Sequence, residues 1–289
     1  MELSEFRLRL MSEQDISTGM RLKELAGWNQ VETDWLGFLE IEPTGCFVGE
    51  LDGEVVATGT AFNFANRFGW IGMILVDPGY RRRGIATKMM QQTISYLDSK
   101  GCCCLKLDAT DAGTKVYSRM GFQTEYQVER WLLSRAEFHL PPSPDETEIT
   151  FLSKQHLGAI EDLDEDAFGA SRKRLLKRYL EKGRFSFAYG EPTCPEGFVL
   201  GRPGSTMYQV GPLVAQTPEI ARLLLQTALV AAAGTPVIVD IPVVNPHIVG
   251  LLEEYGFERK RTLNRMYRGD NLHPGHPEKI FCLAGFEFG

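Results

Sequence analysis

The same order of strand-forming and helix-forming segments occurs twice in this chain, and this repetition restricts the possible folds more than any other feature. Residues 1–135 show the patterns of a strand, two helices, three strands, a long helix, a strand, a short helix and a last strand. The same order returns after the Pro-rich residues 139–148. The sequence therefore predicts an α/β (α+β) protein with two related domains, residues 1–138 and 149–289, joined by a linker at residues 139–148.

The most informative junction in the first copy is the stretch VDPGYRRRGIATKMM, residues 76–90. The apolar run before it predicts a buried strand that ends at Asp77-Pro78. From Gly84 the apolar residues take helical spacing until Gly101, which is typical of a helix end. The chain is thus expected to pass from a buried strand, through a glycine-containing turn, into a long helix.

Composition and charge exclude several classes of protein. The formal net charge of the 289 residues is −7 and both copies are mildly acidic, whereas nucleic-acid binding relies on an extended basic face. No segment approaches the roughly 18 apolar residues of a membrane span, and the N-terminal residues do not resemble a signal peptide. We therefore expect a cytoplasmic protein that binds neither nucleic acid nor membrane. The six cysteines lack metal-ligand spacing, so we expect reduced thiols and no metal.

The turn before the long helix has the chemistry of a phosphate site. A tight turn at the start of a helix presents unpaired backbone N–H groups at the positive end of the helix dipole. Arg81, Arg82 and Arg83 precede Gly84, and guanidinium groups add charge-assisted hydrogen bonds to an anion. Without this context, three arginines at a helix start are equally well explained as a solvated charge run.

Two motifs make residues 5–135 resemble the GNAT acetyltransferase superfamily. Arg81-Arg82-Arg83-Gly84-Ile85-Ala86 matches the family pattern (Gln/Arg)-x-x-Gly-x-(Gly/Ala), and Tyr117-x-x-x-Gly121-Phe122 matches its closing helix and strand. The resemblance implies tandem folds, each with a mixed, mostly antiparallel sheet flanked by helices, and acetyl-CoA as the cosubstrate. It implies that acetyl-CoA is bound by the strand end Ile74, Leu75 and Val76 and by the loop Arg81, Arg82, Arg83, Gly84, Ile85, Ala86 and Thr87, with pyrophosphate on the backbone N–H groups of residues 82–87.

The resemblance also implies that Tyr117 is a general acid. The thiolate that leaves in acyl transfer from a thioester departs more easily when it is protonated, and a phenol is still protonated near neutral pH. Packing of the Tyr117 ring in the core is the alternative. The strand before the loop, WIGMILV, lacks the glutamate that many family members use as the base. A water chain or another carboxylate must then take the proton. Asp108 and Asp111, at the end of the next strand, are the candidate bases, although simple capping or surface roles are favoured for each.

The acceptor site and the second copy are less clearly marked. Trp28, Trp35 and Phe38 lie on the first two helices, where GNAT substrates are usually bounded, and core packing is the alternative role. The second copy reads VAQTPEIARLL where the first has its glycine and arginines, and Leu252 where the first has tyrosine. Asn245 and Asp240 near its strand end are predicted to form turns, and side chains that face the cleft are the alternative. The first copy is therefore expected to be the active one.

These features predict an N-acetyltransferase that moves acetyl from acetyl-CoA to a primary amine, by direct attack in a ternary complex. A small-molecule acceptor is the first hypothesis, and a protein or peptide amine is an alternative. A non-catalytic acyl-CoA sensor or scaffold is the alternative from a different functional class.

Overall fold

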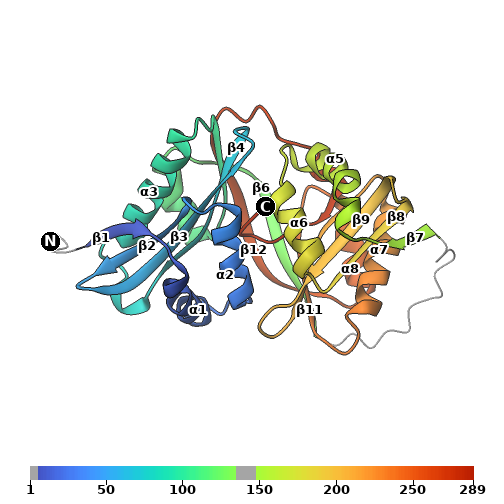
Figure 1. The fold of residues 1–289 in the computed structure, drawn as a ribbon, viewed down its shortest axis with the longest axis horizontal. Coiled ribbons are helices and arrows are strands. Elements are labelled where there is room, and N and C mark those ends of the chain that lie inside the picture. Colours follow the sequence, from blue (N-terminus) through green and yellow to red (C-terminus); the bar gives the residue numbers. More distant parts are fainter. Residues whose placement is uncertain (1–5, 135–147) are drawn as a thin grey trace.

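The computed structural model describes residues 6–134 and 148–289, so residues 139–147 of the expected linker lie outside the described chain. The first half has the predicted order of elements, drawn in blue to green in Figure 1. Its strands are β1 (Arg7–Leu10), β2 (Cys46–Leu51), β3 (Glu54–Phe64), β4 (Phe68–Val76), β5 (Cys104–Ala109) and β6 (Gln123–Leu133). Its helices are α1 (Ile16–Leu25), α2 (Glu32–Ile41), α3 (Ile85–Ser99) and α4 (Asp111–Ser118).

The second half repeats this order and adds one short strand at its end. Its strands are β7 (Ile149–Phe151), β8 (Phe185–Glu191), β9 (Cys194–Arg202), β10 (Tyr208–Ala215), β11 (Val237–Pro242), β12 (Glu258–Gly269) and β13 (Ile280–Cys282). Its helices are α5 (Leu157–Phe168), α6 (Lys173–Lys182), α7 (Pro218–Ala231) and α8 (Pro246–Glu254). The predicted α/β class and the repeated order are confirmed, whereas β7 and β13 were not predicted.

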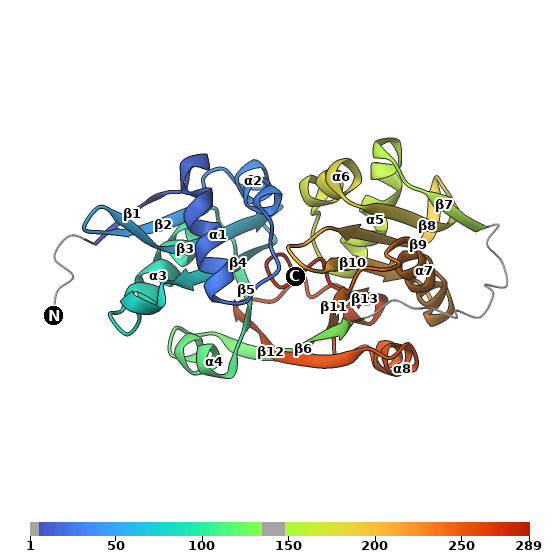
Figure 2. The same cartoon turned by 90° about the horizontal axis from the view of Figure 1, so that it is seen from below.

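The two halves share one sheet because each contributes its last long strand to the other. The strand order of the described residues is β1-β2-β3-β4-β5-β12-β6-β11-β10-β9-β8-β7, with β13 beside β10. β12 from the second half therefore lies next to β5, and β6 from the first half lies next to β11. Figure 2 shows β12 and β6 running together between α4 and α8. Most neighbours are antiparallel, while β4 with β5 and β10 with β11 are parallel.

Two equivalent buried ion pairs hold the exchanged strands in register. Arg265 of β12 lies opposite Asp108 of β5, and its Nε and Nη2 donate to both carboxylate oxygens at 2.9 Å. Arg130 of β6 lies opposite Asp240 of β11 and makes the same two-pronged contact at 2.7 Å. A one-residue slip would turn these side chains to the other face of the sheet, so the pairs specify the register.

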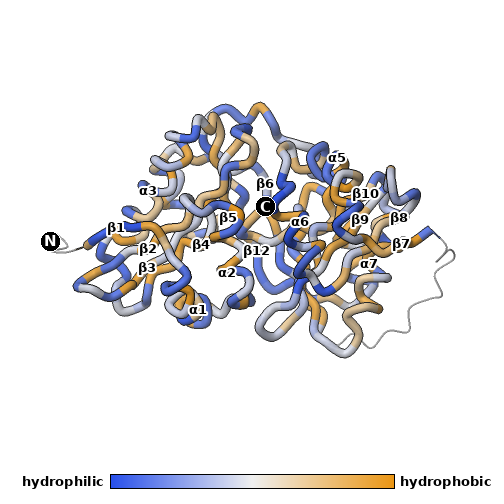
Figure 3. The backbone as a smooth tube through the Cα atoms, in the orientation of Figure 1, coloured by the Kyte–Doolittle hydropathy of each residue, from blue (hydrophilic) through white to orange (hydrophobic). Residues whose placement is uncertain are grey.

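Helices cover both faces of the sheet. On one face α1 and α2 approach α5 and α6, and their side chains form one apolar core that spans both halves, including Trp35, Phe38, Phe168 and Phe288. On the other face α3 and α7 each cover a separate core. Figure 3 shows hydrophobic and hydrophilic segments alternating along the strands and helices of both halves. The shared core makes the two halves one structural unit.

Candidate active site

The site lies where β4 and β5 separate. The parallel ladder between them joins only Gly69 with Leu105 and Trp70 with Lys106. Beyond Trp70 the pairing of β4 with β3 is shifted, and Met73 takes a φ of 52°, which side chains other than glycine rarely adopt. Such a bulge bends a strand and redirects its edge. The separated ends of β4 and β5 therefore leave a gap inside the sheet.

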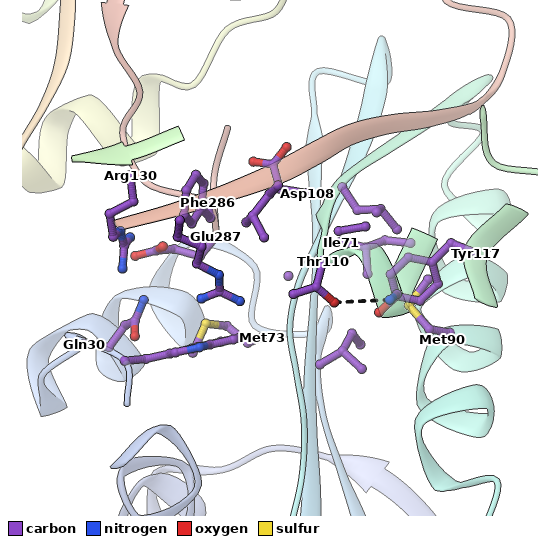
Figure 4. A pocket seen from close by; sticks show the side chains of 18 residues that line it. Gln30, Ile71, Met73, Met90, Asp108, Thr110, Tyr117, Arg130, Phe286 and Glu287 are labelled. Atoms are coloured by element: carbon purple, nitrogen blue, oxygen red, sulfur yellow. Dashed lines mark hydrogen bonds between the residues drawn. The ribbon is translucent and has the colours of Figure 1, made fainter. Parts of the chain in front are cut away.

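A cavity of about 160 Å³ occupies this gap. Figure 4 shows Tyr117 and Met90 at one end of it and Gln30, Arg130 and Glu287 at the other. The side chains come from both halves of the chain, because β12, β6 and residues 283–289 all reach it. The lining comprises Trp28, Gln30, Ile71, Gly72, Met73, Ile74, Met90, Leu107, Asp108, Ala109, Thr110, Gly113, Tyr117, Arg130, Arg261, Leu263, Phe286 and Glu287.

The loop before α3 has the backbone geometry of an anion site. Gly84 caps the helix in the left-handed conformation, with φ of 80°, which glycine adopts without strain. The backbone N–H groups of residues 82–87 donate to no acceptor within the described chain. They lie at the positive end of the helix dipole, where an anion is stabilised. The loop can therefore bind a phosphate group through its backbone.

The three arginines of this loop are exposed and have no acidic partner among the described residues. Nε of Arg81 donates to the carbonyl oxygen of Val76 at 3.1 Å, and the Arg83 guanidinium lies 5.3 Å from the centre of the Tyr80 ring. Ile85 is buried under the helix, whereas Ala86 is exposed and Thr87 half-buried. Of the expected strand-end residues, Ile74 lines the cavity, whereas Leu75 and Val76 lie beyond its lining.

Tyr117 reaches the cavity from α4. Thr110 caps this helix by accepting a hydrogen bond from the Gly113 N–H at 3.1 Å, the dashed line in Figure 4. A Cβ atom on Gly113 would lie 3.2 Å from the Tyr117 ring, so a residue without a side chain makes room for it. The Tyr117 hydroxyl makes no hydrogen bond to any described residue. Burial raises the pKa of this phenol, so it stays protonated at neutral pH.

The two candidate bases are placed differently. Asp108 lines the cavity, but both of its oxygens accept from Arg265 and its side chain is only 1% exposed. Burial raises the pKa of Asp108, and the Arg265 guanidinium opposes that change. Asp111 is exposed on the first turn of α4, outside the cavity lining. Asp108 is therefore a structural ion-pair partner, and Asp111 is a surface residue at a helix start.

The three aromatic residues expected at the acceptor site lie in two different environments. Trp28 lines the cavity. Trp35 and Phe38 are fully buried and pack against each other, with ring centres 5.4 Å apart. They belong to the core shared by both halves and cannot contact a molecule in the cavity. Among these three only Trp28 is placed where it could contact a substrate, and that contact stays a prediction.

Sequence reasoning missed the residues that the second half adds to this cavity. Arg261 comes from β12, and Phe286 and Glu287 come from the segment that follows β13. Arg130, on β6 of the first half, was missed as well. That segment is fixed against β4, because Trp70 Nε1 donates to the Phe286 carbonyl at 3.1 Å. No local pattern around these residues signals a site, because only the strand exchange brings them there.

The equivalent gap of the second half is filled. β10 and β11 also pair at only one end, from Tyr208 to Val210, and then separate. Here β13 pairs with the freed edge of β10 at Leu213 and Val214. The Asn245 side-chain amide donates to the carbonyls of Glu278 and Ile280, which fixes the start of β13. The second half thus closes with its own strand the space that the first half keeps as a cavity.

The turn predictions for the second half have different outcomes. Asn245 does cap α8, because its side chain accepts from the His247 N–H at 3.1 Å. Asp240 does not form a turn: it lies fully buried within β11 as the partner of Arg130. A lone aspartate in an apolar strand is explained by a cationic partner from a distant segment, which the sequence does not reveal.

Two further absences hold for the part of the chain that the structure describes. No group of three or more His, Cys, Asp or Glu side chains is arranged to hold a metal ion. None of the helices combines the length and apolar character needed to cross a membrane. All six cysteines are free thiols.

Comparisons with known families agree with this geometry. Residues 13–122 match the model of the acetyltransferase (GNAT) family, and residues 160–282 match a model of an acetyltransferase (GNAT) domain. The chain is therefore a two-domain member of the GNAT acetyltransferases, a family that uses acetyl-CoA.

Among its relatives is the holothin acyltransferase of Pseudoalteromonas sp. (strain SANK 73390), 26% identical over 91% of this chain and 87% of that protein. The uncharacterized N-acetyltransferase YitH of Bacillus subtilis is 26% identical over 86% of each chain. A putative acetyltransferase from Pyrococcus horikoshii has the same fold, with a TM-score of 0.86, 23% identity and coverage of 100% of this chain and 98% of that one. A tandem GNAT protein from the clavulanic acid biosynthesis pathway shares it with a TM-score of 0.65, 14% identity and coverage of 92% and 98%.

Proposed function

We propose that the first half transfers the acetyl group of acetyl-CoA to the primary amine of a small molecule. The observation that carries this proposal is that the separated ends of β4 and β5 and the free hydroxyl of Tyr117 line one cavity. The pyrophosphate of acetyl-CoA would bind the N–H groups of residues 82–87 at the start of α3. Its pantetheine arm would then run along the edge of β4 near Ile74 toward Tyr117.

Direct attack by the amine on the thioester fits the composition of the cavity. A covalent acyl-enzyme requires a nucleophile such as cysteine or serine, and the residues that line the cavity include neither. Tyr117 would donate its proton to the departing thiolate, because burial keeps the phenol neutral. Backbone N–H groups near the Met73 bulge would polarise the thioester carbonyl.

Glu287 is the carboxylate best placed to take the proton that the amine must lose. Its Oε1 accepts a hydrogen bond from Arg202 Nη2 at 2.5 Å, whereas Oε2 accepts none within the described chain. The side chain is 3% exposed and borders the cavity, so one oxygen remains for an ammonium group or a bridging water. Asp108 lacks such an oxygen because Arg265 occupies both.

A small acceptor is favoured by the size and the walls of the cavity. At about 160 Å³ the cavity is smaller than typical drug-sized pockets, and both halves of the chain form its walls. The relative from Pseudoalteromonas is named as an acyltransferase for holothin, which is consistent with a small acceptor.

The test measures release of free CoA from acetyl-CoA across a panel of amines, amino acids and peptides, with the acetylated product identified by mass spectrometry. Tyr117→Phe should lower kcat by about 10²–10⁴-fold and leave calorimetric acetyl-CoA binding unchanged, because only the proton donor is lost. Tyr255→Phe, at the end of α8 in the second half, is the matched control and should retain activity.

Three outcomes would contradict parts of this proposal. Failure of the wild-type protein to bind acetyl-CoA would overturn it entirely. Binding without acetylation of any amine would replace it by a non-catalytic acyl-CoA sensor. Full activity of Tyr117→Phe would remove the general-acid role and leave acyl transfer itself in place.

A further inference from the structure

Among the charged side chains that line the cavity, Arg261 alone has no hydrogen-bond or ion-pair partner in the described part of the chain. Asp108 is paired with Arg265, Arg130 with Asp240, and Glu287 with Arg202. Arg261 is half-buried in β12, and it makes no hydrogen bond or ion pair with any residue that the structure describes. A guanidinium with five N–H donors and no acceptor in a partly buried position is uncommon, because buried charges are normally paired.

The position of Arg261 in the sheet makes its lack of a partner more unusual. Arg261 lies directly opposite Arg130 in the ladder between β12 and β6. Like charges at facing positions destabilise a sheet. The one carboxylate in this row, Asp240, is already occupied by Nε and Nη2 of Arg130. Burial and the charge of Arg130 lower the pKa of Arg261, and the charge of Asp240 opposes them only in part.

A second polar group in the cavity also lacks a partner. The side-chain oxygen of Gln30 is buried and makes no hydrogen bond within the described chain. Figure 4 places Gln30 at the same end of the cavity as Arg130 and Glu287, opposite Tyr117. Unsatisfied buried polar groups are costly unless a ligand completes them. Trp28 and Phe286 supply apolar surface beside these groups.

We infer that the acceptor amine carries an anionic group, a carboxylate or a phosphate, which binds the Arg261 guanidinium. This rests on the proposed function, because the acceptor must enter the end of the cavity away from α3. Planar guanidinium groups bind both kinds of anion with two parallel hydrogen bonds. Gln30 accepts a hydrogen bond from the same molecule. The phosphates of acetyl-CoA are bound elsewhere, by the loop of residues 82–87.

The experiment compares the wild-type protein with Arg261→Gln and with Arg259→Gln as a matched control. Arg259 lies on the same strand, outside the cavity lining. Its side chain is 61% exposed, and its Nη1 donates to Glu129 Oε1 at 3.0 Å. The acceptor probes are matched pairs: phenylalanine with phenylalaninamide for the carboxylate, and phosphoethanolamine with ethanolamine for the phosphate. Each variant is assayed for kcat/KM, for the KM of acetyl-CoA and for thermal stability.

The wild-type protein should prefer one anionic member of these pairs over its neutral partner by about tenfold or more, as expected for a charge-assisted hydrogen bond. Arg261→Gln should lose this preference, keep the KM of acetyl-CoA, and melt at the same temperature as the wild type or higher. Arg259→Gln should keep the preference. A purely structural role for Arg261 would instead lower the melting temperature and leave the preference intact.

Equal use of anionic and neutral acceptors by the wild type would overturn the inference, as would a preference that survives in Arg261→Gln. If no amine is acetylated, the proposed function fails. The inference that Arg261 binds an anionic group is then tested by binding of the anionic probes alone. In that case the anionic probes, added without acetyl-CoA, should raise the melting temperature of the wild type and of Arg259→Gln but not of Arg261→Gln. No such shift with any anionic probe would overturn it.

Discussion

The two halves of this protein treat the same gap in the sheet in opposite ways. In the first half β4 and β5 separate after Trp70 and leave a cavity that Tyr117 borders. In the second half β10 and β11 separate after Val210, and β13 pairs with the freed edge of β10. A strand edge in a sheet needs hydrogen-bond partners. The second half supplies them from its own chain, whereas in the first half β5 pairs with β4 only at Gly69 and Trp70.

The helix that follows each gap shows the same difference. The start of α3 has a left-handed glycine and free N–H groups at residues 82–87. The start of α7 is capped by Thr217, whose side chain accepts from the Ile220 N–H at 3.3 Å, and Glu219 adds a negative charge to its first turn. Capping satisfies the groups that would otherwise bind an anion. Loss of the anion site and closure of the gap therefore occur together in the second half.

Both halves exchange a strand, and a buried ion pair holds each exchanged strand in place. Breaking these ion pairs should have the largest effect on stability. Asp108→Asn leaves Arg265 buried without a counter-charge, which should lower the free energy of unfolding by about 3–5 kcal/mol. Asp240→Asn should cost less, because the Arg130 side chain is 14% exposed and water can reach it. Denaturant unfolding of both variants measures the two effects.

The same variants separate a structural role of Asp108 from a role as base. If Asp108→Asn unfolds at the wild-type denaturant concentration but loses activity, Asp108 acts in the chemistry and the ion pair contributes little. A loss of activity that follows the loss of folded protein supports the structural role.

Introducing a carboxylate at the start of α3 and, separately, at the start of α7 should show which helix start binds the phosphates of acetyl-CoA. Gly84→Glu places a negative charge beside the free N–H groups of residues 82–87 and forces a side chain into the left-handed conformation. We expect acetyl-CoA affinity to fall by roughly a hundredfold, since several charge-assisted hydrogen bonds are lost. Gln216→Glu, at the start of α7, should change it less than about twofold. Isothermal titration calorimetry measures both.

A fall in affinity with Gln216→Glu as large as that with Gly84→Glu would mean that the second half also binds acetyl-CoA. Unchanged binding in Gly84→Glu would instead place the phosphates away from the start of α3. Both variants introduce a glutamate, so the comparison controls for the added negative charge.

Local patterns predicted the parts of this site that lie within one continuous segment. The loop of residues 81–87 was predicted because the residue types that set its backbone geometry are adjacent in the sequence, and Tyr117 was predicted because its spacing to Gly121-Phe122 resembles the GNAT motif. Arg261 and Glu287 could not be found in this way, because β12 and the segment after β13 reach the cavity only through long-range pairing. Trp35 and Phe38 were expected near the substrate, since an aromatic pattern on a helix does not distinguish a core from a cavity wall.

The closure of the second gap can be weakened by removing the side chain that holds β13. Asn245→Ala deletes two hydrogen bonds to the carbonyls of Glu278 and Ile280 and the cap of α8. Leaving buried carbonyls unsatisfied should lower the free energy of unfolding by about 1–3 kcal/mol. Activity per folded molecule should not change, because β13 faces the gap of the second half. Chemical denaturation and the thiol-release assay together check this, and a large loss of activity would show that the two gaps are coupled.

The smallest expected effect concerns the short turns that begin each half. Ser12 and Asp15 form a capping box in the first half, and Ser153 and His156 form one at the equivalent place in the second. Hydrogen bonds from Arg9 hold the pKa of Asp15 below its usual value. A carboxyl group with a lowered pKa in the folded state adds stability above its unfolded pKa, near 3.9, and that stability is lost as the pH falls through the folded value.

Asp15→Asn should therefore lower stability at neutral pH by at most about 1 kcal/mol, because Arg9 is 35% exposed and water screens the pair. The difference from the wild type should begin to shrink below about pH 4, where Asp15 of the unfolded chain binds a proton, and should be lost as the pH falls through the lower pKa of the folded protein. Urea unfolding between pH 3 and pH 7 measures it. A difference that stays constant over this range would show that the carboxylate charge of Asp15 does not contribute, and that its hydrogen bond to the Ser12 N–H alone fixes the turn.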